Sequence, residues 1–346
     1  MQALRGLATL GVLLAHLFMV EGKYSPDQLM GEWSNLGHWG VDIFFVISGF
    51  IMVYVTWNGE RGWGQLPSYL FRRVSRIYPL YWIVSAAVLV VWLWRPDMVF
   101  ASNRPDILRS FALFPAKNQP LLAVGWTLVF EMYFYLVFGL LLIFPRRWLL
   151  PLLGLWALAV GVGWHMLDPL PEEAVLRHVF NPLTFEFIAG AVFGVAYVRG
   201  FKSVPHNVIF AVIGVAVALL GVVYVTQPDM QAFIGMWGLR VSLFGFAALM
   251  AFAAMVLSGY QAGRVPVWLG DISYSLYLTH VLSLTVVGRL AQPHLREGYA
   301  DNVALIAVMI VAALVVGHLT YVLIERPIIN WFKRRRRSQG RALAAH

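Results

Sequence analysis

The sequence predicts an all-α protein, a polytopic transmembrane helical bundle of about ten helices with both termini in the cytoplasm. Of its 346 residues, 60% are hydrophobic and only 12% are charged, and the mean hydropathy is +0.71. Soluble domains are nearer half apolar and a quarter charged. The apolar residues also gather in stretches close to the roughly 20 residues that a helix needs to cross a bilayer. These two observations predict a membrane protein.

Ten stretches have the length and composition of membrane spans. They lie at residues 3–20, 38–57, 77–94, 123–144, 148–166, 180–198, 207–226, 237–257, 266–289 and 302–324. The first stretch has the outline of a signal peptide, since a positive charge precedes an apolar run. No small-residue cleavage site follows it and nine more spans do, so we expect it to remain as a helix of the mature protein.

The distribution of basic residues predicts the topology. If the N-terminus is inside, the inner segments hold most of the 26 Lys and Arg residues, as the positive-inside rule requires. Residues 1–332 are then expected to form one transmembrane domain and 333–346 a basic cytoplasmic tail. The tail's KRRRR run is best interpreted as a topology anchor, with a lipid-binding patch as the alternative and no nucleic acid partner expected.

Several classes of site are excluded or disfavoured by the composition. The chain has no Cys, which excludes disulfides, thiolate metal sites and cysteine nucleophiles. It has neither a P-loop nor a metal-ligand spacing such as HExxH, so we expect no metal. No internal repeat is visible, which disfavours an inverted-repeat transporter. Three loops, at 21–37, 95–122 and 166–179, are expected on the outer side, where they could cover a site.

Two ionisable residues stand eleven positions apart in the first predicted span, Arg5 and His16. Eleven steps of 100° return a helix to within about 20° of the same face, about 16 Å further along its axis. Both side chains therefore face one groove, with Arg5 at the cytoplasmic end and His16 toward the outer half. The alternative is that Arg5 anchors the helix end and His16 is a hydrogen-bonded core histidine.

The second predicted span begins GHWGVDIFFVISGFIM and places Asp42 near the outer surface, at about the depth of His16. A carboxylate beside an imidazole fixes its tautomer and raises its basicity, which a general base requires. We therefore expect Asp42 to orient His16. The alternative is an ordinary polar residue at the start of a helix.

Arginines gather at the inner start of the third predicted span, YLFRRVSRIYPLYW, as Arg72, Arg73 and Arg76. Arg73 and Arg76 share one helix face because they are three positions apart. Guanidinium groups bind phosphates bidentately, so this cluster suits a phosphorylated ligand. Its alternative role is to anchor the helix on the positive-inside side.

Two further spans carry polar residues that are costly in a bilayer. Glu131, in GWTLVFEMYFYLVFG, lies near the middle of the fourth span, where a carboxylate is neutral or needs a cation or hydroxyl partner. The ninth span, LGDISYSLYLTHVL, has a polar stripe that includes Tyr274, Tyr277 and His280. These could bind an acceptor or make hydrogen bonds between helices.

The predicted depths of these groups suggest a reaction across the membrane. The arginines that can bind phosphate lie at the inner face of the membrane. Deeper in the bilayer lie His16, Asp42, Glu131 and His280. This arrangement is expected when a phosphorylated cytosolic donor reaches partway into the bilayer and meets an acceptor from the other side.

The same residues resemble the acyltransferase 3 family, bacterial integral-membrane O-acyltransferases that modify sugars and related acceptors. Six motifs occur in order: R-x10-H from Arg5 to His16, GVDIFFVISGFIM, FRRVSRIYPLYW, WTLVFEMYFY, ISYSLYLTH and ERP at 325–327. The resemblance covers almost the whole chain, and the opening QALRG is most similar to the branch associated with exopolysaccharide acetylation. In one departure, family members usually carry several residues before the arginine motif, whereas Arg5 is almost terminal.

The resemblance implies a multi-pass enzyme of the bacterial inner membrane that takes acetyl-CoA from the cytoplasm. The family's R-x-x-R motif falls on Arg73 and Arg76 and implies donor binding there, and the family's histidine falls on His16 and implies a residue essential for transfer. We hypothesise that the phosphates bind near Arg72, Arg73 and Arg76, that the pantetheine arm passes Arg5, and that the thioester reaches His16. His16 would act as a general base or would itself be acetylated and relay the group.

The predicted function is transfer of an acetyl or other short acyl group to a hydroxyl of a cell-envelope or exported polysaccharide or glycolipid. One alternative is a transporter or flippase of a lipid-linked glycan, which would move its substrate without dependence on CoA. Another is a non-catalytic membrane scaffold. The candidate residues are catalytic His16, Asp42 and Glu131; donor-binding Arg5, Arg72, Arg73 and Arg76; and acceptor-binding Tyr274, Tyr277 and His280.

Overall fold

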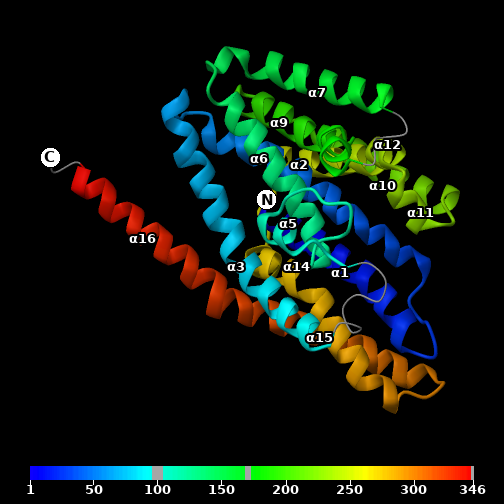
Figure 1. The fold of residues 1–346 in the computed structure, drawn as a ribbon. Helices are drawn as coiled ribbons and strands as arrows, with labels where there is room; N and C mark the ends of the chain where they lie inside the picture. Colours follow the sequence, from blue (N-terminus) through cyan, green and yellow to red (C-terminus); the bar gives the residue numbers. More distant parts are fainter. Residues whose placement is uncertain (96–103, 168–172, 344–346) are drawn as a thin grey trace.

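The computed structural model describes residues 1–95, 104–167 and 173–343, and within these ranges the regular secondary structure is helical (Figure 1). This confirms the predicted all-α class. The α-helices are α1 (Gln2–Tyr24), α2 (Trp39–Thr56), α3 (Leu66–Trp94), α5 (Ile107–Ala112), α6 (Trp126–Leu141), α7 (Leu149–Met166), α8 (Ala174–Val179), α9 (Thr184–Val198), α10 (His206–Thr226), α11 (Met230–Gly235), α12 (Trp237–Arg240), α13 (Phe246–Leu257), α14 (Arg264–Ala291), α15 (Tyr299–Thr320) and α16 (Arg326–Leu343).

Every predicted span falls on a helix, with two refinements. In the described part of the chain, nine helical segments are long and apolar enough to cross a membrane. The predicted span 266–289 is not among them, although it lies in the 28-residue helix α14, because Ser, Thr, Tyr and His interrupt its apolar residues. The predicted span 77–94 is only the second part of α3, so the arginines before it belong to the same continuous helix.

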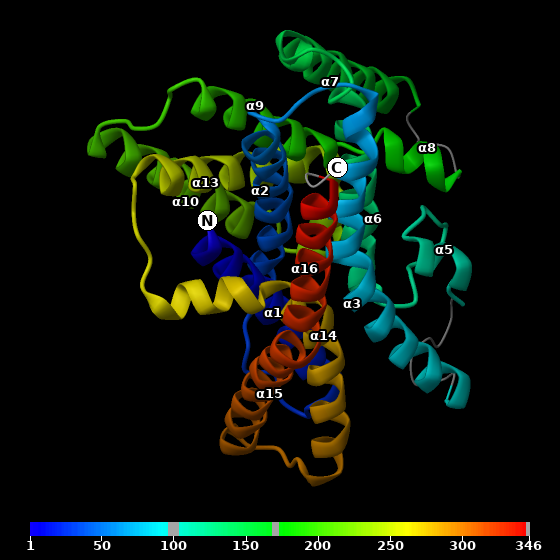
Figure 2. The same ribbon diagram turned by 90° about the vertical axis from the view of Figure 1, so that its left-hand side faces the viewer.

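Two sets of packed helices build the bundle. Side chains of α2, α3, α6, α7 and α9 form the largest buried apolar cluster, and those of α1, α14 and α15 form a second one. Within these sets, α1 lies along α14 and α2 lies along α9 (Figure 2). The site residues of α1 and α2 are therefore placed between the two sets rather than on the lipid-facing side.

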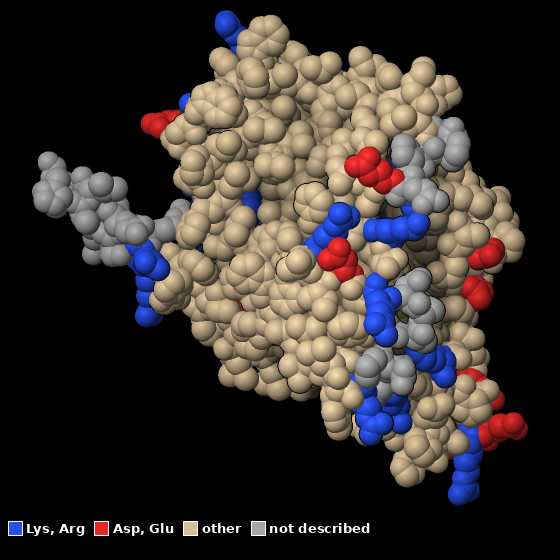
Figure 3. All heavy atoms as spheres, viewed as in Figure 1, with Lys and Arg blue, Asp and Glu red and all other residues tan. Residues whose placement is uncertain are grey.

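The outer surface carries few charges over wide areas. On the face shown in Figure 3, the Lys, Arg, Asp and Glu side chains gather along one side and at the edges, and broad areas without charge lie between them. Large apolar side chains are exposed along several of the spans, among them Leu155 and Leu158 of α7 and Phe210 and Val217 of α10. Such a surface is expected where helices contact lipid, because the bilayer core offers no water to a charged group.

The contact between α2 and α9 depends on glycine. Gly190 and Gly194 form a GxxxG pair in α9, and a Cβ added at Gly190 would collide with the backbone carbonyl of Val46 in α2. Small residues allow membrane helices to approach this closely, so that dispersion attraction between the helices replaces the hydrophobic effect that lipid does not supply. The glycine pair thus fixes the distance of α2 from α9.

The C-terminal segment continues the last span. A π-helical turn (Tyr321–Glu325) joins α15 to α16, which passes next to α3, where the rings of Phe332 and Phe71 are 5.8 Å apart (Figure 2). Most of the predicted tail 333–346 is therefore helical, and residues 344–346 lie outside the described residues. The cytoplasmic location of both termini stays a prediction from the basic residues.

Candidate functional site

Two neighbouring cavities between the helices contain most of the candidate residues. The smaller has a volume of about 90 Å³ and the larger about 620 Å³. Tyr277 of α14 and Val41 of α2 line both. We call them the arginine cavity and the histidine cavity, after the residues described below.

The arginine cavity brings together Arg5 from α1 and Arg73 and Arg76 from α3. Arg5 donates a hydrogen bond to Ser273 of α14, with 3.2 Å between Nη2 and Oγ, while the Arg73 guanidinium lies 5.7 Å and 5.5 Å from the rings of Tyr69 and Tyr135. In the described residues, the buried Nε atoms of Arg5 and Arg73 have no hydrogen-bond partner. The cavity therefore offers positive charge and unused donors to an anion.

Arg72 does not line this cavity. Its side chain is exposed, and its Nη2 lies 3.4 Å from Oγ of Ser68, one turn earlier on the same helix. Around α3, Arg76 lies between the other two arginines, about 40° from Arg72 and 60° from Arg73. The cavity lies on the Arg73 side of this fan. The expected cluster of three is thus divided, with two arginines at the cavity and one at the surface.

Glu131 of α6 also lies in the arginine cavity rather than beside His16. Its Oε1 accepts hydrogen bonds from the hydroxyl of Tyr135 and from Ser48 of α2, the latter over 2.7 Å. The sequence-based expectation of a hydroxyl partner for this carboxylate is confirmed. Its position next to the arginines means that Glu131 can act on a ligand of the arginine cavity, through charge or hydrogen bonding, and not as a direct partner of His16.

The histidine cavity lies between α1, α14 and the segments around α5 and α8. His16 and His38 line one part of it, Trp126 and Trp237 another, and residues 114–120 close one side. A volume of about 620 Å³ lies within the range of roughly 300–1,000 Å³ typical of small-molecule sites. Two of the three loops predicted to cover a site, 95–122 and 166–179, contribute to this lining, whereas none of the lining residues comes from 21–37. Residues 96–103 and 168–172 lie outside the described residues.

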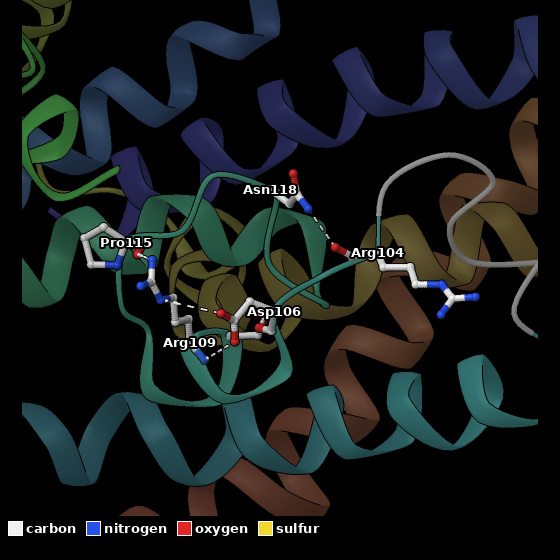
Figure 4. A network of polar contacts seen from close by, with 6 residues as sticks. Arg104, Asp106, Arg109, Pro115 and Asn118 are labelled. Carbon is white, nitrogen blue, oxygen red and sulfur yellow. Dashed lines mark hydrogen bonds and ion pairs between the residues drawn. The ribbon is translucent and has the colours of Figure 1, made fainter. Parts of the chain in front are cut away.

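The loop that closes the histidine cavity is held by its own polar contacts (Figure 4). Asp106 accepts the backbone N–H of Arg109 at the start of α5 and also pairs with its side chain, at 3.5 Å from Nε. Arg109 in turn donates to the carbonyl of Pro115, and Asn118 donates to the carbonyl of Arg104. These bonds hold the wall of the cavity in place before any ligand binds.

His16 is held in one orientation by two acceptors. Its Nδ1 lies 2.8 Å from the carbonyl oxygen of Val12, one turn earlier, and 3.3 Å from Nε2 of His280 in α14. A carbonyl can only accept, so Nδ1 carries the proton and Nε2 keeps the lone pair in the neutral ring. Because His16 lines the histidine cavity, it has the protonation pattern that a general base requires there.

His280 contacts His16 and lines neither of the two cavities described above. It is 1% exposed, and its Nδ1 lies 2.8 Å from the carbonyl of Tyr277, which leaves Nε2 as an acceptor for the Nδ1–H of His16. The acceptor-binding role expected for His280 stays a prediction, and the described contacts place its ring against His16. His16 and His280 are 264 positions apart in the sequence, so no local pattern could predict this contact.

The expected contact between Asp42 and His16 is absent from the described hydrogen bonds. Asp42 instead forms a bidentate ion pair with Arg240 at the end of α12, with Nη2–Oδ2 at 2.8 Å and Nε–Oδ1 at 3.1 Å. Both side chains are almost fully buried, at 0% and 1% exposed. Equal depth on two helices does not fix the direction in which a side chain points. The carboxylate of Asp42 points toward Arg240, another polar residue within a predicted span, and not toward His16.

The two tyrosines predicted to bind the acceptor, Tyr274 and Tyr277, lie in different places. Tyr274 lines only the arginine cavity and donates to the carbonyl of Ile77 over 2.7 Å. Tyr277 stands between the cavities, where its hydroxyl is 2.8 Å from Oγ1 of Thr127 and 3.3 Å from the carbonyl of Val124. Tyr277 is thus the candidate residue that faces both cavities.

Sequence reasoning missed His38 and did not connect Tyr135 or Ser48 with Glu131. His38 is in the motif GHWGVD, at the first position of the second predicted span, where it has the pattern of an interfacial residue. Across the described ranges, no group of three His, Asp or Glu side chains has a geometry that could hold a metal ion.

Comparisons with known proteins identify the family of the chain. A family model described as an acyltransferase domain matches residues 1–322. The exopolysaccharide production protein ExoZ of Rhizobium meliloti is 30% identical, covering 90% of this chain and 96% of its own length. The putative membrane-bound transacylase BcsY of Komagataeibacter xylinus is 27% identical over 98% of this chain and 86% of its own. The peptidoglycan O-acetyltransferase OatA of Listeria monocytogenes is 25% identical over 95% of this chain and 56% of its own. No solved structure matches.

Proposed function

Because the chain belongs to the acyltransferase 3 family and is a multi-pass membrane protein, we propose that it transfers an acetyl or other short acyl group from cytosolic acyl-CoA to a carbohydrate hydroxyl. The acceptor is a cell-envelope or exported polysaccharide or a glycolipid. Acyl transfer itself is the activity of the family, whereas the donor and the acceptor are argued from the two cavities. The observation that carries the proposal is that an arginine-lined cavity and a histidine-lined cavity lie on either side of Tyr277, which lines both.

The arginine cavity supports a donor that carries phosphates. Arg5, Arg73 and Arg76 supply three guanidinium groups, and two buried Nε donors are unused in the described residues. Phosphate oxygens satisfy such donors through charge-assisted hydrogen bonds. The cavity itself is small, so the phosphates of CoA would bind at its arginine side and the slender pantetheine arm would enter it.

In the proposed transfer step, His16 accepts one proton and later returns it. Its Nε2 removes the proton from the acceptor hydroxyl as that oxygen attacks the thioester carbonyl carbon. The carbon–sulfur bond then breaks, and the proton passes from His16 to the departing thiolate of CoA. His280 keeps Nδ1 protonated throughout, so the lone pair stays on Nε2. In the alternative order, His16 is acetylated first and the acceptor attacks the acyl-imidazole.

The histidine cavity supports a carbohydrate acceptor. It is several times larger than the arginine cavity, and it has both the tryptophan rings on which sugars can stack and the amide side chains of Asn118, Gln119 and Gln231, which can bond to hydroxyls. The printed names of ExoZ and OatA refer to an exopolysaccharide and to peptidoglycan, which agrees with an envelope glycan here.

The test uses the full chain in nanodiscs with radiolabelled acetyl-CoA and a crude envelope glycan fraction. We expect His16→Ala to bind acetyl-CoA without turnover, and Arg73→Ala with Arg76→Ala to weaken binding by about tenfold or more per arginine. Arg72→Ala is the matched comparison, because this arginine lies outside the cavity, and a smaller loss is expected.

Two outcomes would contradict the proposal. If the wild-type protein neither binds nor consumes acetyl-CoA with glycan present, the donor assignment is wrong and a glycan transporter becomes the better hypothesis. If His16→Ala turns over at the wild-type rate while correctly folded, the catalytic assignment is wrong.

A further inference from the structure

His38 shares the histidine cavity with His16, although its sequence context does not single it out. It ends the 3₁₀ helix Glu32–His38, directly before α2. Its ring centroid is 5.5 Å from that of His16, with an angle of 65° between the ring planes. Both rings line the same cavity, so a ligand that reaches one of them meets the other.

Two glycine contacts fix His38 in this place. A Cβ at Gly37 would collide with the backbone carbonyl of Gly11, and a Cβ at Gly40 would collide with the carbonyl of Ala8. The backbone on both sides of His38 is therefore pressed against α1, the helix that carries His16. Such close approach requires residues without side chains, and it places the histidine with little freedom to move.

The ring of His38 has an unused hydrogen-bonding atom. Its Nε2 is buried and has no partner among the described residues, whereas the Nδ1 atoms of His16 and His280 each have an acceptor at 2.8 Å. A buried polar atom without a partner has lost its hydrogen bonds to water and gained none in return, so such atoms in native proteins call for an explanation. A ligand hydroxyl is a suitable partner, because it can both donate and accept.

We propose that His38 binds the hydroxyl adjacent to the one that is acylated, so that the acceptor site recognises a vicinal diol on a sugar ring. This inference rests on the proposed function and narrows its substrate class. His16 takes the proton of the attacking hydroxyl, and His38 hydrogen-bonds its neighbour and fixes which of the two faces the thioester. His38 is thus a specificity residue, and it forms no covalent bond.

The test separates diols from isolated hydroxyls in the same glycan fraction. Periodate cleaves the carbon–carbon bond of a vicinal diol, and borohydride then reduces the aldehydes to alcohols, so hydroxyls remain but the ring diols are lost. We expect the wild-type protein to acetylate glycan treated with borohydride alone and to lose most transfer to the oxidised and reduced glycan.

Variants of His38 test the residue itself. We expect His38→Ala to raise the acceptor KM about tenfold or more, with the Kd for acetyl-CoA unchanged, because His38 does not line the arginine cavity. His38→Gln, which keeps a hydrogen-bonding group, should fall between alanine and wild type. It also carries the test if the alanine variant does not fold, as judged by gel filtration and tryptophan fluorescence.

The results that overturn the inference differ from those that overturn the function. Equal acetylation of oxidised and control glycan excludes a vicinal diol as the required acceptor. A wild-type acceptor KM in both His38 variants excludes a role for His38 in binding the acceptor. If the wild-type protein transfers nothing to control glycan although it binds acetyl-CoA, the proposed glycan acceptor fails, and the diol inference fails with it.

Discussion

The ion pair between Asp42 and Arg240 gives the sharpest test of the structural reasoning. Its two side chains lie 198 positions apart in the sequence and are 0% and 1% exposed, and they are joined by two hydrogen bonds of 2.8 Å and 3.1 Å. The perturbation is Asp42→Ala, which removes the carboxylate and leaves the guanidinium buried. Arg240→Ala is the reciprocal change and leaves the carboxylate buried.

The expected loss follows from the burial of the pair. Two charges removed from water attract each other strongly, but most of that attraction only offsets their desolvation. Removing one partner exposes this cost, and the free energy of unfolding should fall by about 3–5 kcal/mol for either single variant. Replacing both charges, as Asp42→Leu with Arg240→Met, should recover most of the loss, since apolar side chains carry no desolvation cost.

The assay is reversible unfolding in mixed micelles titrated with SDS, followed by tryptophan fluorescence, for wild type, both single variants and the double variant. A single variant within about 0.5 kcal/mol of wild type would refute the reasoning, as would a double variant that loses the sum of the two single effects. Either result would mean that the two groups do not stabilise each other.

The double variant also tests the role of Asp42 in the reaction. If the double variant is as stable as wild type and still transfers acetyl groups, Asp42 supports the fold alone. If it is stable but inactive, the charged pair serves the reaction through the wall of the histidine cavity, which Arg240 lines.

Three further predictions follow from single contacts. Gly190→Ala should lower the free energy of unfolding by about 1–3 kcal/mol, because the new Cβ would collide with the carbonyl of Val46. Gly214→Ala is the control: its Cβ would have no atom within contact distance, so it should stabilise α10 by up to about 1 kcal/mol. SDS titration measures both variants, and equal effects would contradict the close contact at Gly190. His280→Ala should lower kcat by about tenfold or more with little change in the Kd for acetyl-CoA, because the catalytic imidazole loses an acceptor that orients it; an unchanged kcat would exclude that role. Tyr277→Ala should increase acetyl-CoA hydrolysis in the absence of acceptor, because this side chain stands between the two cavities. Scintillation counting of released acetate measures the hydrolysis. An unchanged rate would argue against a separating role for Tyr277.

The sequence by itself determined which segments are helical and which residues share a helix face. Both follow from local physics: apolar stretches of sufficient length form helices in lipid because the backbone must satisfy its own hydrogen bonds, and the period of 3.6 residues fixes the faces. Arg73 and Arg76 could therefore be grouped on one side of α3. The same period places Arg72 only about 40° from Arg76, so it does not by itself exclude Arg72 from the cavity.

Only the tertiary structure decided which faces meet. His280 approaches His16 from 264 positions away, Arg240 takes the carboxylate expected to serve His16, and Glu131 turns toward the arginines. The depth of a residue can be read from its span, but the rotation of each helix about its axis depends on packing against its neighbours, such as the glycine contacts of α1 with the segment around His38. Since those contacts join distant parts of the chain, no local pattern in the sequence could specify them.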